Sequence, residues 1–354
     1  MVGFGNGPRS LEDRALPHSA STAASRLRRL TVVSALAVVA FAATACGSTS
    51  SSSTVAVAKD YAPVRGVSSG VNLAQCGKDT RTIKHDVGTT TVHGNPTRIV
   101  ALELSFVDAL TNVGIKPVGV ADDGNRKVLL PQLRTAAGNY TSVGLRSTPN
   151  LQVITSLHPD LIIADTSRHK AIYAQLSKIA PTVEFASLSG TYQQVLDSEM
   201  LIAEAVNRCD PMKAKLAQHE QIMAGYQKEV PPGEHRTAIF AVSSDKLFGV
   251  QTLTSFAPGV LQQLGLKPAL TSQDSVVHVT LESLFAAKPG VMFVAYASKK
   301  DMAVQWQSTS LWGQLPAVAN HEYFEVDRAT WSKSRGLLAA ELIAKAVMKD
   351  VYGK

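Results

Sequence analysis

The sequence predicts an α/β protein of two lobes with mainly parallel sheets, joined by a long helical connector and enclosing a ligand cleft between the lobes. Short apolar strands alternate with amphipathic helices, which is typical of parallel sheets. The chain has 354 residues, more than a single hydrophobic core usually holds. Residues 191–230 have high helix propensity and separate two segments of the same pattern. A hydrophobic fraction of 45% excludes disorder of the whole chain, and three cysteines exclude a disulfide scaffold.

The first 45 residues have the pattern of an export signal. A basic cluster at 26–29 precedes an apolar run at 30–45, which is shorter than the ~20 residues that a membrane-spanning helix needs. Small residues lead to Cys46, and a serine-rich stretch follows it. We therefore expect a signal peptide over 1–45, lipidation of Cys46, and a lipid-anchored tether and leader over 46–97. An unmodified Cys46 beside an ordinary cleavage site is the alternative.

Loss of the signal lowers the net charge from +7 to +4, because residues 1–45 carry five arginines and two acidic residues. This mild excess excludes a nucleic-acid-binding surface and is compatible with a site for an anion. We expect the exported protein in the periplasm or on the outer face of the cytoplasmic membrane. Cys76 and Cys209 can pair in that oxidising compartment, but the sequence does not show whether they are close.

The first lobe is expected over 98–190. It begins with an apolar, β-branched strand at 99–102. Ser105 supplies a hydroxyl N-cap for the next helix, with the carboxylate of Asp108 three residues on. Gly114 ends that helix, and strands and helices then alternate to the end of the lobe. This order predicts a parallel sheet.

The second lobe, expected over 231–354, repeats the plan of the first. Residues 281–293 align without gaps on 151–163, and both segments have the pattern of a short helix, a turn at proline and a strand. A pseudo-repeat of two lobes explains this match. The alternative is a chance similarity between the turn and helix-ending sequences that are common in α/β proteins. The connector over 191–230 is helical and stiff, which argues against a large hinge closure.

Motifs for enzymatic chemistry are weak or missing. Gly66–Gly70 satisfies G-x-S-x-G around Ser68, but no strong strand precedes it and no amphipathic helix follows. The chain has no phosphate-binding loop, no H-E-x-x-H and no paired C-x-x-C. We therefore expect no enzyme and no metal bound directly by the protein. An exported serine hydrolase using Ser68 is the alternative from another class, and a lipoprotein with an envelope or sensor role is a third.

Polar and cationic side chains follow the carboxyl ends of the predicted strands, where α/β proteins bind ligands. If the strand ends of the two lobes face each other, these side chains line one basic cleft. Arginine suits carboxylate ligands because its planar guanidinium offers a fork to two oxygens. Each arginine also has a structural interpretation as a solvated or internally paired charge, and the indole of Trp331 as a cap on the core. The candidate ligand-binding residues are Glu103, Ser105, Arg146, Ser167, Arg168, Tyr296, Trp331 and Arg335.

Three short motifs carry a resemblance to a known family. VALELSF at 100–106, SRH at 167–169 and TW with RG at 330–336 are similar to the ferric dicitrate-binding members of the helical-backbone substrate-binding proteins. That family serves ABC importers for iron siderophores and cobalamin. The resemblance covers about 98–350. It implies a receptor that captures ferric citrate outside the membrane and delivers it to a membrane permease.

The resemblance also implies partners and roles. It places most of the candidate residues near the ligand, with iron(III) held by citrate oxygens and no cofactor. Family members dock on the permease through an acidic residue in each lobe; Glu282 fits this role, but Gln152 stands at the matching position of the first lobe. A ferric hydroxamate or catecholate siderophore is the alternative ligand. We expect a monomer that contacts the membrane through its N-terminal lipid and binds no nucleic acid.

Overall fold

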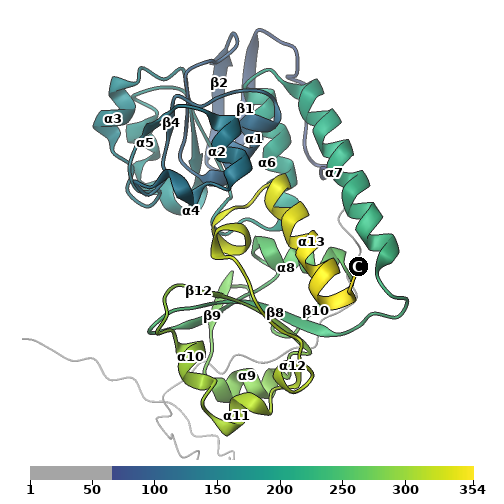
Figure 1. Cartoon of the computed structure of the whole chain (residues 1–354). Helices are drawn as coiled ribbons and strands as arrows, with labels where there is room; N and C mark the ends of the chain where they lie inside the picture. Colours follow the sequence, from purple (N-terminus) through teal and green to yellow (C-terminus); the bar gives the residue numbers. More distant parts are fainter. Residues whose placement is uncertain (1–65) are drawn as a thin grey trace, which may run out of the picture. The chain divides into compact units, whose positions relative to one another are not determined.

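The computed structural model describes residues 66–354, so the expected signal peptide, the lipidation site at Cys46 and the first part of the tether, 46–65, lie outside the described residues. Figure 1 shows the described part as an α/β protein with one large sheet in each lobe and a separate two-stranded sheet, β1-β2. Long helix α7 (Cys209–Glu229) bridges the two lobes. The predicted fold class is therefore confirmed. Within this part of the chain, none of the helices is long and apolar enough to cross a membrane.

The first lobe contains a five-stranded, all-parallel sheet in the order β5-β4-β3-β6-β7. Strands β3 and β6 are buried along their whole length, as expected for apolar strands covered on both faces. Successive residues of β3 face opposite sides of the sheet. Ile99 packs in the core that includes the connector helices, and Val100 packs in the core beside α3. The elements are β3 (Ile99–Ala101), α1 (Leu104–Asn112), β4 (Gly119–Val120), a 3-10 turn (Arg126–Val128), α2 (Pro131–Ala137), β5 (Thr141–Ser142), α3 (Leu151–Ser156), β6 (Leu161–Asp165), α4 (Thr166–His169), a 3-10 turn (Lys170–Ile172), α5 (Tyr173–Leu176) and β7 (Thr182–Phe185).

Helix α1 begins earlier than the sequence suggested. The N-cap is Glu103, with extended φ of −140°, and its side chain does not cap the helix. The prediction that Ser105 caps this helix is therefore wrong, because the chain already turns into the helix directly after β3. The Ser105 hydroxyl instead lies 2.8 Å from that of Ser187. Asp108 accepts from the backbone N–H of Leu338 at 3.1 Å.

The segment before the first sheet is attached to the connector. Strands β1 (Thr80–His85) and β2 (Gly88–His93) form an antiparallel hairpin. The backbone N–H of Ser68 donates to Asp197 at 2.7 Å. A disulfide joins Cys76 to Cys209 across a sequence separation of 133, so the pairing that the sequence left open is formed. In the described chain, turns and no helix follow Ser68, whereas the nucleophile elbow of a serine hydrolase leads directly into a helix.

The connector consists of α6 (Tyr192–Ala205) and α7. A capping box starts α6, since the Thr191 hydroxyl accepts from the N–H of Gln194 and the Gln194 side chain accepts from the N–H of Thr191. Helix α7 has 21 residues, which corresponds to about 32 Å. It packs against both α6 and the last helix of the chain, α13 (Leu337–Tyr352). The connector is therefore supported along its length rather than hinged.

The second lobe contains a mixed sheet in the order β11-β9-β8-β12-β13, with β10 also paired to β8. Strands β8, β12 and β13 run parallel, and β9 and β11 form an antiparallel extension at one edge. The elements are β8 (Thr237–Ser243), β9 (Phe248–Gln251), α8 (Phe256–Gln263), β10 (Lys267–Pro268), β11 (Val276–His278), α9 (Leu281–Ala287), β12 (Val291–Tyr296), α10 (Met302–Trp306), α11 (Ser310–Gly313), α12 (Pro316–Ala319), β13 (Tyr323–Glu325) and a π turn (Ala329–Lys333) before α13. The pairs α3–β6 and α9–β12 share the arrangement of helix, turn and strand that the internal repeat predicts.

Helix α13 returns to the first lobe and packs against α7 beside a group of buried acids. Asn112 donates to the carboxylates of both Asp108 and Glu199, at 3.2 and 3.3 Å. Burial raises the pKa of Asp108 to about 6 and raises that of Glu199 as well. Gly336 precedes α13 directly against Asp108, because a Cβ at this position would lie 2.0 Å from Oδ2. The joint between the lobes is thus close-packed and polar.

Candidate anion-binding cleft

One buried carboxylate lies at the centre of the candidate site. Glu103 is 0% exposed, and three guanidiniums surround it. Arg146 Nη1 lies 3.3 Å from its carboxylate and Arg168 Nε 2.5 Å. Arg335 Nη1 is more distant, at 3.9 Å. Arg146 comes from a loop of the first lobe, Arg168 from the short helix α4, and Arg335 from the segment before α13. Four of the eight predicted residues therefore meet at one place.

Arg146 is held by a second carboxylate. Its backbone N–H donates to Asp123 Oδ1 at 3.0 Å, and its Nε and Nη2 donate to Asp123 Oδ2 at 3.2 and 2.7 Å. Burial acts to lower the pKa of Arg146, but the hydrogen bonds and charges of Asp123 and Glu103 outweigh it and raise the pKa. Most donors of this guanidinium are therefore already used inside the first lobe.

Asp165 and His169 position the loops that carry the arginines. Asp165 is the N-cap of α4, where Oδ1 accepts from the N–H of Arg168 at 2.8 Å, and Oδ2 accepts from Ser187 N–H at 2.7 Å. The backbone N–H of Asp165 donates to His169 Nδ1, so the ring proton is on Nε2, which donates to the carbonyl of Arg146 at 2.7 Å. Burial lowers the pKa of His169, in agreement with a neutral ring. The sequence could have revealed Asp165, since an Asp directly after a strand fits an N-cap.

Arg335 makes the longest contacts of the three arginines. Its guanidinium makes the long contact with Glu103 and a weak bond of 3.5 Å to the carbonyl of Lys333. Burial lowers the pKa of Arg335, and the charges of the neighbouring arginines act in the same direction. Arg335 is also the one member of the arginine cluster that lines the cleft. Arg335 is therefore the arginine of this cluster that an anion in the cavity can contact.

The cleft is a cavity of about 350 Å³ with walls from both lobes. Loop residues after β7 form one side, and the β8, β9 and β11 strands form most of the other. Nearly all of these residues were not predicted from the sequence, because the short strands β9 and β11 have no clear alternation of apolar and polar residues. The lining residues are Leu188, Ser189, Val242, Ser244, Leu247, Gly249, Gln251, Ser255, Ser275, Val276, His278, Ser332 and Arg335.

Two predicted serines lie at the edge of this region. The hydroxyl of Ser167 donates to that of Ser189 at 3.3 Å, and Ser189 lines the cleft. Ser105 is buried and bonded to Ser187, one residue from the cleft wall at Leu188. Both serines thus make hydrogen bonds to the loop after β7, which forms one wall of the cleft.

Trp331 and Tyr296 lie apart from the arginines. Trp331 is 3% exposed and stacks on Phe293 with ring centroids 4.6 Å apart, so its indole packs in the core. The hydroxyl of Tyr296 contacts that of Tyr323 and accepts from Gln307 at 3.0 Å. Tyr296 follows the alternation of β12 and faces the α9–α12 side of the sheet. Neither side chain lines the cleft.

The two positions expected to dock on a permease are exposed in corresponding helices. Gln152 lies in the first turn of α3, where Asn150 caps the helix, and this turn contains no acidic residue. Glu282 lies in the first turn of α9, capped by Thr280. Hydrogen bonds from its own backbone N–H and from Thr280 lower the pKa of Glu282. The two lobes therefore have corresponding helices, α3 and α9, but only α9 carries an acidic residue in its first turn.

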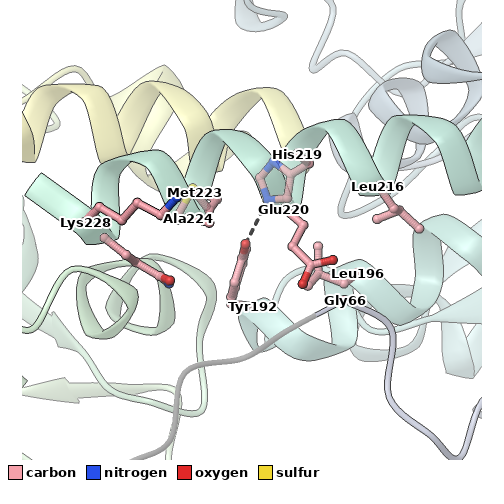
Figure 2. Close-up of a pocket in the computed structure, with 10 residues that line it drawn as sticks. Gly66, Tyr192, Leu196, Leu216, His219, Glu220, Met223, Ala224 and Lys228 are labelled. Carbon is pink, nitrogen blue, oxygen red and sulfur yellow. Dashed lines mark hydrogen bonds between the residues drawn. The ribbon is translucent and has the colours of Figure 1, made fainter.

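A second cavity, of about 370 Å³, lies along α7 away from the predicted residues (Figure 2). The Tyr192 hydroxyl lies 2.8 Å from His219 Nε2 there, and the other ring nitrogen of His219 is 2.8 Å from Glu341. This cavity has no arginine in its lining. Over residues 66–354, no three histidine, cysteine or acidic side chains gather as a metal site.

Comparisons with known proteins agree with this architecture. The "Fe(3+)-citrate-binding protein YfmC" of Bacillus subtilis is 43% identical over 82% of this chain and 93% of its own length. The "Fe(3+) dicitrate-binding periplasmic protein FecB" of Escherichia coli is 38% identical over 76% of this chain and 89% of its own length. The solved structure of Staphylococcus aureus SirA with staphyloferrin B has the same fold, with a TM-score of 0.68 and 23% identity over 77% of this chain and 99% of that one.

The family described as "Periplasmic binding protein" matches residues 99–330, a range that runs from strand β3 to the π turn before α13. The match includes both sheets, the connector and the arginine loops of the first lobe. The chain therefore belongs to the family of periplasmic binding proteins.

Proposed function

We propose that this chain captures ferric citrate (Fe³⁺-dicitrate) outside the cytoplasmic membrane and delivers it to the permease of an ABC importer. The observation that carries the proposal is the convergence of Arg146, Arg168 and Arg335 on Glu103, with Arg335 lining a cleft between the two lobes. Two relatives, 43% and 38% identical, are named for binding ferric citrate. The chain is a binding protein and not an enzyme.

The arginines would neutralise citrate carboxylates, and iron would stay coordinated by citrate oxygens. A hydrogen bond to a charged group contributes roughly 1.5–3 kcal/mol. A micromolar affinity needs about 8 kcal/mol, so three or four such bonds supply much of it before ordering costs are subtracted. Arg168 and Arg335 are the main donors for this role, because Arg146 is already bonded to Asp123.

Calorimetry with ferric citrate tests this proposal. We expect Arg168→Ala and Arg335→Ala each to weaken binding about tenfold or more, the loss of one charge-assisted bond. Arg208→Ala is the control, since Arg208 is exposed and outside the cleft. Unchanged affinity in both arginine variants would contradict the proposal. Tighter binding of an uncharged ferric hydroxamate than of ferric citrate would favour the alternative siderophore ligand.

Relatives of this chain include periplasmic proteins and lipoproteins. We propose that this chain is anchored on the outer face of the membrane through a lipid on Cys46. Labelling of cells with a radioactive fatty acid tests the anchor, and Cys46→Ser should abolish the label.

We also propose that Glu282 docks on the permease. Glu282→Ala should then lower iron uptake without changing ferric citrate affinity, because Glu282 is exposed and not part of the cleft. Gln152→Glu, which supplies the missing acid of the first lobe, should leave uptake unchanged or raise it. Uptake that is insensitive to Glu282→Ala would contradict this role.

A further inference from the structure

The wall of the cleft opposite the first lobe has a different chemistry from the arginine cluster. Of the side chains that line the 350 Å³ cavity, Arg335 is the single permanent charge. The others are hydroxyls, one amide, one imidazole and apolar groups. Two apolar side chains are notably exposed at this wall, Leu247 at 48% and Val276 at 40%. The cavity therefore changes from cationic at Arg335 to uncharged along the edge strands β9 and β11.

Strand pairing gives this uncharged wall a defined shape. Val276 of β11 lies opposite Gln251 of β9, and His278 lies opposite Gly249. Val276 and His278 are two residues apart, so their side chains are on the same face of the strand. A Cβ at Gly249 would come within 2.9 Å of Val276 Cγ1 and 3.6 Å of His278 Cδ2. The missing side chain at Gly249 thus lets both neighbours lie close over β9.

A compact, fully ionised ligand would not use this wall. Carboxylates gain most from Arg335 and the adjacent cluster, whereas Leu247 and Val276 gain only from contact with uncharged groups. Exposed apolar side chains gathered at one cavity are typical of a binding surface. Hydroxyl and amide groups in the same wall add hydrogen-bonding partners for an amide or hydroxyl of the ligand.

We infer that the wall formed by Leu247, Gly249, Val276 and His278 is a subsite for an uncharged arm of the cargo. The ligand class is then a citrate-type ferric chelate with carboxylates at Arg335 and an alkyl-amide arm along β9 and β11. This inference rests on the proposed function, because it takes Arg335 as the carboxylate site. It makes the wall, and not the arginines, the determinant that distinguishes between different citrate-type chelates.

The test compares two probes by calorimetry on the full chain: ferric citrate, and the ferric complex of citrate with one terminal carboxylate converted to an N-butyl amide. We expect the amide complex to bind at least as tightly as ferric citrate. The double variant Leu247→Ala with Val276→Thr should weaken the amide complex about tenfold and change ferric citrate less than twofold. Val304→Thr is the matched control, since Val304 is also 40% exposed but does not line the cleft.

The outcomes separate this inference from the proposed function. If ferric citrate binds and depends on Arg335, but the wall variants leave both probes unchanged, the subsite is refuted and the proposed function stands. An equal loss for both probes also refutes the subsite, because the wall then contacts citrate itself. If neither probe binds, the proposed function fails, and the subsite fails with it. Gly249→Ala is a second test of the subsite. The added Cβ would displace Val276, so this variant should weaken binding of the amide complex and leave binding of ferric citrate unchanged.

Discussion

Replacing Glu103 by Gln removes the charge that holds three arginines together while preserving the volume of the side chain. The carboxylate is 0% exposed and lies within 4 Å of guanidiniums from both lobes. Without it, Arg168 and Arg335 keep no carboxylate partner in the described structure. Removing one partner of a buried ion pair costs about 3–5 kcal/mol, because the remaining charge is buried and unpaired.

The expected result is a large loss of thermal stability. At roughly 2 °C per kcal/mol for a protein of this size, the melting temperature should fall by about 6–10 °C. Differential scanning calorimetry in a buffer without polyanions measures this fall. Glu325→Gln is the matched control, since Glu325 is exposed and has no ion pair described, and it should melt within 1–2 °C of the wild type, the usual range for a surface substitution.

Added citrate tests whether a ligand carboxylate can replace part of the missing negative charge. A ligand carboxylate near Arg335 would supply part of the missing negative charge, so citrate should raise the melting temperature of Glu103→Gln more than that of the wild type. Adding Arg335→Leu to the Gln variant should restore part of the stability, because one uncompensated cation is removed. The proposed role of Glu103 is refuted if Glu103→Gln has the same melting temperature as the wild type, or if citrate raises the melting temperature of both proteins equally.

Three further predictions concern the body of the protein. Gly336→Ala should destabilise by at least about 1–3 kcal/mol in urea unfolding, because its Cβ would lie 2.0 Å from Asp108 Oδ2, whereas Gly313→Ala, with open space around it, should be neutral. Glu184 is buried with both carboxylate oxygens unbonded, and its pKa is raised to about 7 by burial and by neighbouring carboxylates. The unfolded chain ionises this carboxyl near pH 4.5 and the folded protein only near pH 7, so stability is lost as the pH rises from about 4.5 to 7. Glu184→Gln should therefore gain about 1–3 kcal/mol at pH 8 and little at pH 5; an equal gain at both pH values contradicts this. Cys209→Ser should cost up to about 5 kcal/mol, since the disulfide closes a loop of 133 residues, and a reductant should lower the stability of the wild type but not of the variant.

Much of the first lobe could be predicted from the sequence because its strands are short, apolar and followed by helices. The position of Arg168 followed from the same pattern, since it lies three residues beyond the carboxyl end of β6, in the short helix α4. The internal repeat correctly paired α3–β6 with α9–β12. These features depend on local order along the chain, which the sequence shows directly.

The uncharged half of the cleft could not be predicted in this way. Strand β11 has three residues and is defined by its pairing with β9, about 25 residues earlier in the chain. Its side chains become a cleft wall only through that pairing. The face of Tyr296 could have been predicted, because Met292, Val294 and Tyr296 alternate along β12 and point away from the core around Phe293.

The burial of Glu103 follows from the stiffness of the joint. Since α7 and α13 pack along each other, we expect no large closure that would carry Arg335 toward the first lobe when a ligand arrives. The three guanidiniums must therefore lie close together in the empty protein, where they repel one another. A permanent carboxylate at their centre offsets that repulsion and fixes their geometry before binding. Arg146, bonded also to Asp123, then serves mainly to hold this arrangement. Arg335 makes the longest contacts within the cluster and lines the cleft, so it remains available to an incoming anion.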